Sequence, residues 1–572
     1  MHSLEKTQKN GSKVTGIAIV VIVHIGLAFA FFGCSEPARM VARVSMPVET
    51  RIIEEMRPSS LPQMEVNVSQ PTASMSAPAY IPMAEQLAQA PMLSPPTTNK
   101  FPGNEVNPAV LVEERPVSTF SIDVDTASYA YVRRLLSAGI LPPAEAVRIE
   151  EMVNYFPYQY ATPANPAQPF GISTEVMPSP WQAGNQLVHI AVRGYDIAAA
   201  KRPPVNVVLL IDVSGSMEPD DRLPLLKRGF RMFASQLRDE DRVAIVTYAN
   251  DTKVVLAPTS GRDKAKVIQA IEALGSGGGT NGGDGLAHAY ALAERNFDAK
   301  AVNRVILATD GDFNIGNSDP DQLEKFIAKK RKTGVYLSIF GVGDGNLNDE
   351  LIQRLTQAGN GNAAYIDSVM EARKAMHEEL GSTMFPIAND VKVQVEFNPK
   401  LVAGYRLIGY ETRMLERQDF KDDKVDAGDM GAGHSVTAIY EITPVGARGK
   451  LVDPLRYGKK SAKHAASAAE HGKGELCFVK LRYKLPGEAS SSVTKHVVHA
   501  ASARKSMDAV PEEQRFAVAV AAFGQRLRAE KNVSDFSYAE IAKLANTGRG
   551  QDPFGYRAEF VKLVRTAEGL SH

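Results

Sequence analysis

One stretch of the chain, residues 205–217 with the sequence VNVVLLIDVSGSM, constrains the fold more than any other. Its first seven residues are almost entirely apolar, which predicts a strand that is buried on both faces of a sheet. Beyond that strand, the alternation of an extended chain places Asp212, Ser214 and Ser216 on the same side. Three oxygen donors therefore converge at the carboxyl end of a central strand, where open α/β sheets place their ligands.

Two later stretches add oxygen donors to the same edge of the sheet. Residues 275–285 read GSGGGTNGGDG, and a loop with so many glycines bends tightly enough to bring its backbone and Thr280 close to a bound ion. Residues 304–309 predict another buried strand, and Asp310 follows it directly. Carboxylate and hydroxyl oxygens without a nearby His or Cys suit a hard cation, which is Mg²⁺, Mn²⁺ or Ca²⁺.

These three stretches, D-x-S-x-S, a Thr in a Gly-rich loop and T-D-G after a strand, together resemble the metal-ion-dependent adhesion site of the von Willebrand factor type A (VWA) domain. The resemblance implies that Asp212, Ser214 and Ser216 contact the ion directly or through water. It implies that Thr280 and Asp310 lie beside the ion or one contact further away, depending on whether a ligand is bound. The flanking regions resemble those of a family of bacterial VWA-domain lipoproteins, and the likeness covers residues from about 115 to 570.

The VWA domain is predicted to span residues 203–385 as a doubly wound, mostly parallel α/β sheet, because predicted strands and helices alternate there. The strands are expected at residues 205–211, 242–248, 253–256, 304–309, 335–342 and 364–366. The helices are expected at residues 222–237, 262–274, 283–296, 321–332, 348–358 and 369–380. The VWA resemblance implies that the short strand at 253–256 is an antiparallel edge strand.

Regions on both sides of the VWA domain are predicted to form a second fold. Alternating apolar and polar residues predict strands at 170–176 and 186–192 before it, and at 391–397, 405–411, 435–443 and 476–485 after it. We expect one β-sandwich with a solvated face, into which the VWA domain is inserted or which flanks it. The expected division is an amino-terminal helical module at 116–160, sandwich strands at 161–202 and 386–500, and a carboxyl-terminal helical module at 501–572.

The amino-terminal helical module carries a second group of oxygen donors. Asp123, Asp125 and Ser128 lie at the end of a predicted strand, residues 120–124, and at the start of a predicted helix that stops near Gly139. They are candidates for a further ion site. The favoured interpretation is that they cap the helix and stabilise the turn before it through hydrogen bonds.

The first 34 residues are predicted to be an export signal. Lys6, Lys9 and Lys13 precede residues 14–33, which contain no Asp, Glu, Lys or Arg. The segment leads through a glycine to Cys34, which resembles the lipobox of bacterial lipoproteins, although two Phe residues stand where that pattern has Leu and a small residue. Lipidation of Cys34 is the favoured interpretation. An uncleaved membrane anchor is the alternative, because about 20 apolar residues can span a bilayer.

Both interpretations place most of the chain outside the cytoplasm, since the positive charges precede the apolar segment. Residues 35–115 are predicted to be a disordered tether, because they are rich in proline and poor in aromatic residues. We therefore expect the protein at the bacterial cell envelope, in the periplasm or at the cell surface, and held to the membrane by a lipid or an anchor.

Charge and cysteine content exclude other classes of protein. The chain has 65 Lys and Arg residues and 65 Asp and Glu residues, whereas nucleic-acid binders carry a basic excess, so we expect no nucleic acid as a partner. Two cysteines, Cys34 and Cys477, are too few for a disulfide framework. Cys477 lies in an apolar strand pattern and is predicted to be a buried apolar residue.

The predicted function is non-enzymatic binding of a protein that depends on a divalent cation, in adhesion or assembly. An ion held by only two carboxylates keeps positive charge, so an exposed Asp or Glu of a partner protein can replace one of its waters. The alternatives are an envelope scaffold in which the ion is incidental, and a metal-assisted hydrolase. The hydrolase is disfavoured because no His or second metal is signalled beside the three stretches, and the Gly-rich loop lacks the G-K-[ST] of a P-loop.

Overall fold

The computed structural model describes residues 99–571, except residues 104, 164–166, 280–281, 312–318, 346, 380–381, 383, 426, 448–473 and 489. The predicted export signal with Cys34, most of the predicted tether, and Thr280 lie outside the described residues. None of the helices in the described part of the chain is long and apolar enough to cross a membrane.

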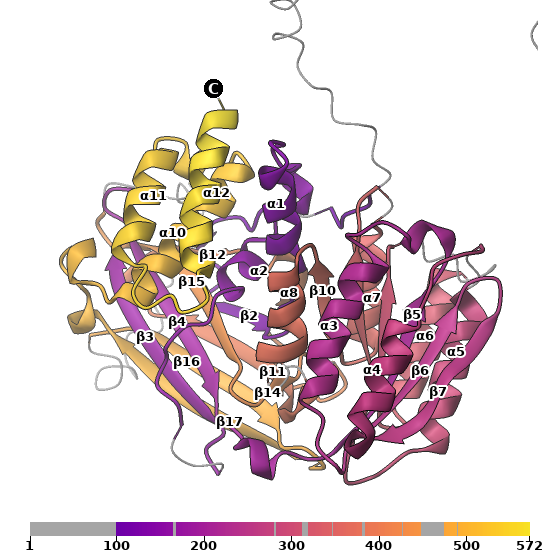
Figure 1. The fold of residues 1–572 in the computed structure, drawn as a ribbon. Helices are drawn as coiled ribbons and strands as arrows, with labels where there is room; N and C mark the ends of the chain where they lie inside the picture. The colour runs from indigo at the N-terminus through magenta and orange to yellow at the C-terminus, as the bar shows by residue number, and fades with distance from the viewer. Residues whose placement is uncertain are drawn as a thin grey trace, which may run out of the picture. The chain divides into compact units, whose positions relative to one another are not determined.

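A six-stranded sheet with the order β10-β9-β8-β5-β6-β7 forms the centre of the predicted VWA domain (Figure 1). Its strands are β5 (Val205–Asp212), β6 (Arg242–Tyr248), β7 (Thr252–Ser260), β8 (Val302–Thr309), β9 (Val335–Val342) and β10 (Ala363–Ile366). Every neighbouring pair is parallel except β6 and β7. The doubly wound α/β fold is thus confirmed, and β5 lies in the interior of its sheet, between β8 and β6.

Helices cover both faces of this sheet (Figure 1). One face packs against α3 (Leu223–Ser235), α4 (Lys264–Glu272) and α8 (Val369–Arg373). The other face packs against α5 (Gly282–Arg295), α6 (Pro320–Arg331) and α7 (Asp349–Ala358). Alternate residues of β5 belong to the two buried clusters, so the apolar run at the start of this strand is buried on both faces as predicted.

Two of the predicted helices are divided in the structure. The predicted helix at 262–274 consists of a 3₁₀ turn, η4 (Gly261–Asp263), and α4. The predicted helix at 369–380 consists of α8 and a π-helical turn, η5 (Lys374–Glu378). Turns of this kind keep the helical direction while changing the hydrogen-bond spacing, so apolar periodicity alone does not reveal them.

Two antiparallel sheets form a sandwich. One sheet has the order β1-β12-β15-β4-β3, made of β1 (Val110–Leu111), β3 (Phe170–Pro178), β4 (Gln186–Gly194), β12 (Val402–Ile408) and β15 (Ser435–Pro444). The other has the order β13-β2-β11-β16-β17, made of β2 (Val117–Ser121), β11 (Pro386–Phe397), β13 (Met414–Leu415), β16 (Glu475–Lys484) and β17 (Ser491–His499), and β14 (Met430–Gly431) pairs with β11. Each sheet combines strands from before and after the VWA domain, which is therefore inserted in the sandwich.

The inner faces of the two sheets share one core. The rings of Phe397 on β11 and Tyr405 on β12 stack with their centroids 4.4 Å apart. Cys477 on β16 is buried in the same cluster, as predicted, and burial raises the pKa of its thiol to about 12.

The expected solvated face is wrong for the sheet that contains β4 and β15. Helices cover its outer face: α2 (Ile149–Asn154), α10 (Glu512–Leu527), α11 (Tyr538–Thr547) and α12 (Tyr556–Leu570), as Figure 1 shows. Leu187 and Ile439 of the sheet belong to the same buried cluster as Phe516 and Phe560 of these helices. The carboxyl-terminal helices thus pack on the sandwich through apolar side chains.

Polar residues on the covered face explain why its strands looked half-solvated. His189 on β4 and Thr437 on β15 are both buried. The hydroxyl of Tyr160 lies 3.1 Å from Nε2 of His189 and 2.7 Å from Oγ1 of Thr437. Internal hydrogen bonds therefore replace the water that the alternating pattern suggested.

Asp123, Asp125 and Ser128 do not cap α1 (Ala127–Ser137), which has no side-chain cap at its amino end. The carboxylate of Asp125 accepts a 2.7 Å hydrogen bond from the N–H of Ala363 at the start of β10. Arg413, from the segment between β12 and β13, pairs with Asp125 at 3.2 Å and with Asp123 at 3.3 Å. The two aspartates thus join the amino-terminal module to the VWA sheet and the sandwich, because buried carboxylates need charged partners. The hydroxyl of Ser128 instead donates a 2.7 Å hydrogen bond to the backbone oxygen of Ala146, within the amino-terminal module.

Candidate metal-ion site

The carboxyl end of β5 brings Asp212, Ser214 and Ser216 together. The backbone N–H of Ser214 donates a 2.9 Å hydrogen bond to Oδ1 of Asp212, and the hydroxyl oxygens of Ser214 and Ser216 are 3.1 Å apart. Asp212 and Ser214 are buried, whereas Ser216 is exposed. The three side chains therefore present oxygen atoms from the interior of the sheet to the surface at its edge.

Asp310 reaches the same edge from β8, the strand next to β5. Its Oδ2 accepts a 2.5 Å hydrogen bond from Nη1 of Arg222. The same Nη1 donates a 2.8 Å hydrogen bond to the backbone oxygen of Ser216, so the guanidinium bridges the two stretches. Sequence reasoning missed Arg222, since it stands immediately before α3, where a charged residue is ordinary and carries no motif.

A glycine makes room for this arginine. Gly343, after β9, has a φ of 72°, and a Cβ atom on it would lie 2.4 Å from Nε of Arg222. The backbone oxygen of the next residue, Asp344, accepts a 3.1 Å hydrogen bond from Nη2 of Arg222. The turn after β9 is therefore part of the site, since a side chain at position 343 would displace the guanidinium.

The glycine-rich loop lies against the Asp212 stretch. The N–H of Gly277 donates a 2.8 Å hydrogen bond to the oxygen of Val213, and the N–H of Gly215 donates a 2.9 Å hydrogen bond to the oxygen of Gly278. Thr280, two residues further along this loop, lies outside the described residues. The backbone contacts hold the described part of the loop beside the end of β5.

The carboxylate of Asp212 is the unusual group of the site. Its Oδ2 is buried and has no hydrogen-bond partner among the described residues. Burial, with a smaller contribution from the charge of Asp310, raises the pKa of Asp212 to about 6. Tyr248, which lies beside Asp212 on β6, places its buried hydroxyl close enough to this carboxylate to lower the pKa of Asp212, by less than burial raises it, but the two do not form a hydrogen bond of good geometry. A cation at Oδ2 would stabilise the ionised carboxylate.

These residues fit a hard divalent cation. Their side chains supply one carboxylate and two hydroxyl groups as oxygen ligands, and the buried Oδ2 of Asp212 is left without a hydrogen-bond partner among the described residues. Asp212 and the hydroxyls of Ser214 and Ser216 would therefore hold the ion together with water, while Asp310 is already paired with Arg222.

The solved structures to which this chain is similar include two bacterial proteins. The von Willebrand factor type A protein from Catenulispora acidiphila is 16% identical, with 69% of this chain and 89% of that chain covered and a TM-score of 0.39. The conserved hypothetical protein BatB from Bacteroides thetaiotaomicron is 22% identical, with 31% of this chain and 97% of that chain covered and a TM-score of 0.27.

Two relatives differ in how much of the chain they match. The protein described as Uncharacterized protein YfbK from Escherichia coli (strain K12) is 40% identical over 490 residues, which are 85% of this chain and 84% of that protein. The protein described as Uncharacterized protein sll0103 from Synechocystis sp. is 27% identical over 172 residues, which are 30% of this chain and 40% of that protein.

Family models match three consecutive regions of the chain. The family described as von Willebrand factor matches residues 95–189, the von Willebrand factor type A domain matches residues 206–378, and the family described as Uncharacterized protein YfbK, C-terminal, matches residues 382–570. With these regions in order, and with more than four-fifths of both chains aligned to the Escherichia coli relative, this chain belongs to the YfbK family of VWA-domain proteins.

Proposed function

We propose that this chain is a protein-binding module that depends on a divalent cation, with Mg²⁺ favoured. The observation that carries the proposal is Oδ2 of Asp212, a buried carboxylate oxygen with no hydrogen-bond partner among the described residues. A divalent cation supplies the missing partner. Asp212, Ser214 and Ser216 hold it, Thr280 completes the set from the glycine-rich loop, and Asp310 acts directly or through a water.

The charge of the site favours an acidic group on the partner. Among the described residues of the three stretches, Asp212 and Asp310 supply the negative charge of the site, and Arg222 pairs with Asp310 at 2.5 Å. A divalent cation in this setting keeps positive charge, and the exposure of Ser216 gives a ligand access from solvent. The proposed role is therefore the capture of an exposed Asp or Glu of another protein, without catalysis.

We further propose that the module is tethered to the bacterial cell envelope. The support is the apolar segment at residues 14–33, Cys34 after it, and the proline-rich stretch at 35–115. A lipid on Cys34 would hold the module at the membrane while the cation site faces the periplasm or the exterior. Metabolic labelling with a fatty acid tests this anchor, because Cys34→Ser loses the label only if Cys34 is lipidated.

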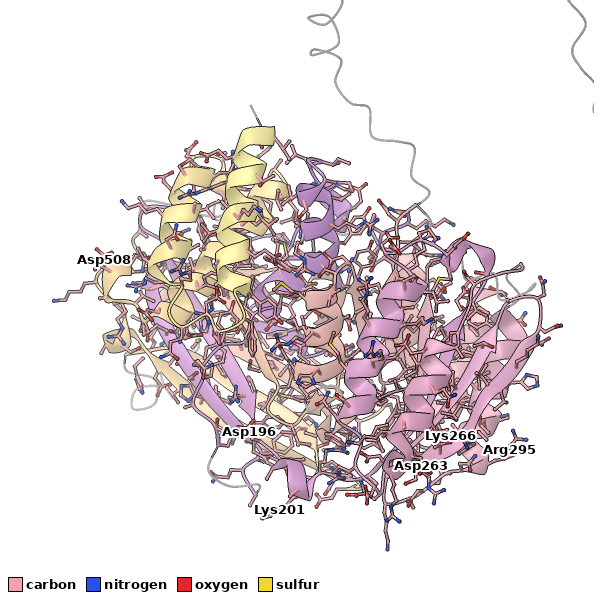
Figure 2. All side chains as sticks on the ribbon, viewed as in Figure 1. Asp196, Lys201, Asp263, Lys266, Arg295 and Asp508 are labelled. Carbon is pink, nitrogen blue, oxygen red and sulfur yellow. The ribbon has the colours of Figure 1, made fainter. Side chains whose placement is uncertain are left out.

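Calorimetry on the full chain tests the cation site. We expect saturable binding of Mg²⁺ or Mn²⁺ by the parent chain and its loss in Asp212→Asn, which removes a charge at nearly constant size. Asp263→Asn is the matched control, because Asp263 is exposed (Figure 2) and lies far from the cation site. It follows β7, whose last residue pairs with the first residue of β6, and this end of the sheet is opposite to the carboxyl end of β5. Full affinity in Asp212→Asn would refute the assignment, and a folded parent without binding would favour the envelope scaffold.

Stability without metal gives an independent test. A carboxyl whose pKa rises from 3.8 to about 6 on folding is destabilised in its ionised form above that range. In a chelator at pH 7, Asp212→Asn is therefore expected to raise the free energy of unfolding by on the order of 2–3 kcal/mol. The gain is expected to shrink towards pH 4, where the parent carboxyl is protonated in the folded state. Urea unfolding at both pH values measures it, and a less stable Asn variant at pH 7 would contradict the proposal.

A further inference from the structure

A cavity of about 430 Å³ lies between the VWA domain and the sandwich, away from the cation site. Its VWA side includes Arg304, the third residue of β8, and residues at the carboxyl ends of α6 and α7. Its other side includes Arg413 and the segment next to β14. Arg304 and Asp310 stand six residues apart along β8 and the residue after it, so about 20 Å separates the cavity from the cation site.

Arg304 is a buried cation with no direct ion pair in the described part of the chain, although the charge of Asp429 raises its pKa and so offsets part of the effect of burial. Arg304 is 3% exposed, and its Nη1 donates a 2.6 Å hydrogen bond to the hydroxyl of Ser338. Its Nε is buried and has no hydrogen-bond partner, and within the described part of the chain no carboxylate forms an ion pair with it. The guanidinium lies 5.7 Å from the ring centroid of Tyr336, and burial lowers the pKa of Arg304 to about 10.

The carboxylates that line the same cavity already have partners. Asp123 pairs with Arg413 at 3.3 Å, and Glu324 pairs with Arg354 at 2.7 Å. Asp429 accepts a 3.0 Å hydrogen bond from the side chain of Asn360. The lining holds four arginines and three carboxylates: Arg304, Arg331, Arg354, Arg413, Asp123, Glu324 and Asp429. Arg413 and Arg354 also pair with Asp125 and Asp321, which lie outside the lining. Arg304 has no such ion pair with any carboxylate of the described residues, which leaves its guanidinium available to an anion in the cavity.

We propose that this cavity binds a small molecule through an oxyanion group, a carboxylate or a phosphate, held by Arg304. A buried charge without a counterion destabilises the folded chain, so an anion that binds beside it in the cavity gains a large favourable interaction energy. The planar guanidinium of arginine matches carboxylate and phosphate oxygens in pairs. The cavity also has the volume of typical small-molecule sites. Because its two sides come from the VWA domain and the sandwich, the ligand contacts both.

Titration of the full chain with inorganic phosphate, and separately with acetate, tests this site at constant ionic strength in chloride. We expect saturable binding of at least one of the two anions by calorimetry, and a loss of at least tenfold in affinity in Arg304→Gln. The anion that binds more tightly identifies the group. Arg295→Gln is the matched control, because Arg295 is an exposed arginine at the end of α5 (Figure 2), and it is expected to bind like the parent.

Two results would overturn the proposal. One is a parent chain that binds neither anion saturably, and the other is Arg304→Gln with the affinity of the parent. Arg304→Gln is expected to melt no lower than the parent without anion, since the variant removes an unpaired charge. If Arg304→Gln does not fold, Arg304→Lys replaces it in the test, because lysine keeps the charge and lacks the planar pair of donors. We expect Arg304→Lys also to bind the anion at least tenfold more weakly than the parent. Unchanged affinity in this variant would refute the role of the guanidinium.

Discussion

At the scale of single residues, Arg222 decides how the charge of the cation site is balanced. Its guanidinium, with a side chain 14% exposed, pairs with Asp310 at 2.5 Å and is fixed by the backbone oxygens of Ser216 and Asp344. Arg222 and a divalent cation would therefore compete for the carboxylate of Asp310. This competition would weaken the binding of the cation and increase its dependence on a partner's carboxylate.

Replacement of Arg222 by Gln is expected to strengthen Mg²⁺ binding by about tenfold, because one half-buried ion pair is worth roughly 1–2 kcal/mol and each 1.4 kcal/mol is tenfold in affinity. Calorimetry on the full chain measures the change. The control is Arg262→Gln, since Arg262 pairs with Asp239 on the surface and has a side chain 76% exposed. Weaker Mg²⁺ binding in Arg222→Gln would show that the arginine instead supports the loop that holds the cation.

The sequence predicts the local part of this site and not the distant part. Alternation along one strand suffices to bring Asp212, Ser214 and Ser216 together, since these residues are neighbours in the chain. Arg222 and Gly343 belong to the same site through a contact between segments more than a hundred residues apart, and neither type of residue is unusual where it stands. Physical contacts of that kind become visible only when the chain is folded.

At the scale of elements, a buried group of charged side chains connects the end of the VWA domain to α1. Arg133 of α1 donates a 2.8 Å hydrogen bond from Nε to Asp367, and its Nη2 pairs with Glu371 of α8 at 2.8 Å. The hydroxyl of Tyr155 donates a 2.7 Å hydrogen bond to the same carboxylate of Glu371. The helix that ends the VWA domain is therefore held by the amino-terminal module.

Removal of Arg133 is expected to be strongly destabilising. Arg133→Ala leaves Asp367 and Glu371 buried without their cation, and loss of one partner of a buried pair costs roughly 3–5 kcal/mol. The adjacent Arg134 is the control, because it pairs with Asp221 at 2.8 Å with a side chain 25% exposed, and Arg134→Ala is expected to cost under about 1 kcal/mol. Urea unfolding compares the two, and equal losses of stability would contradict the role given to Arg133.

Elements with a strong pattern are predicted well, and elements without one are missed. The strands β6 and β9 have the predicted bounds, since their apolar runs are buried on both faces. The edge strand β17 was not predicted, because its residues are mostly exposed or half-buried and include Lys495 and two His residues. Its place in the sheet is decided by pairing with β16, which is a property of two segments and not of one.

At the scale of the whole molecule, the described modules share their buried clusters. One cluster joins the face of the VWA sheet that carries α3 to the inner faces of the sandwich. Another joins the opposite face of the VWA sheet to residues of α1. The insertion of the VWA domain in the sandwich was predictable, because strands with alternating apolar and polar residues occur on both sides of a region in which strands and helices alternate. The shared apolar clusters could not be predicted, because the sequence shows that a residue is apolar but not which other residues pack against it.

These shared clusters should make the modules unfold together. Trp181 is the single tryptophan of the chain, and it lies in the cluster between the sandwich and the carboxyl-terminal helices, 6.3 Å from the ring of Phe536. Its fluorescence therefore reports on a part of the molecule outside the VWA domain, whereas far-UV circular dichroism reports on all of it. We expect the two signals to give the same urea midpoint, because one cooperative unit has one transition.

Mg²⁺ makes this test specific. At a hundred times its dissociation constant, the ion should stabilise the folded chain by about 2.7 kcal/mol, and both signals should move by the same amount only if the VWA domain and the Trp181 cluster unfold as one unit. In Asp212→Asn neither signal should move, since that variant lacks the group proposed to hold the ion. A dichroism transition that shifts while the fluorescence transition stays would mean that binding at β5 is not felt beyond the VWA domain. The ion pairs of Arg133 would then stabilise the contact between α1 and α8 without coupling ligand binding to the rest of the molecule.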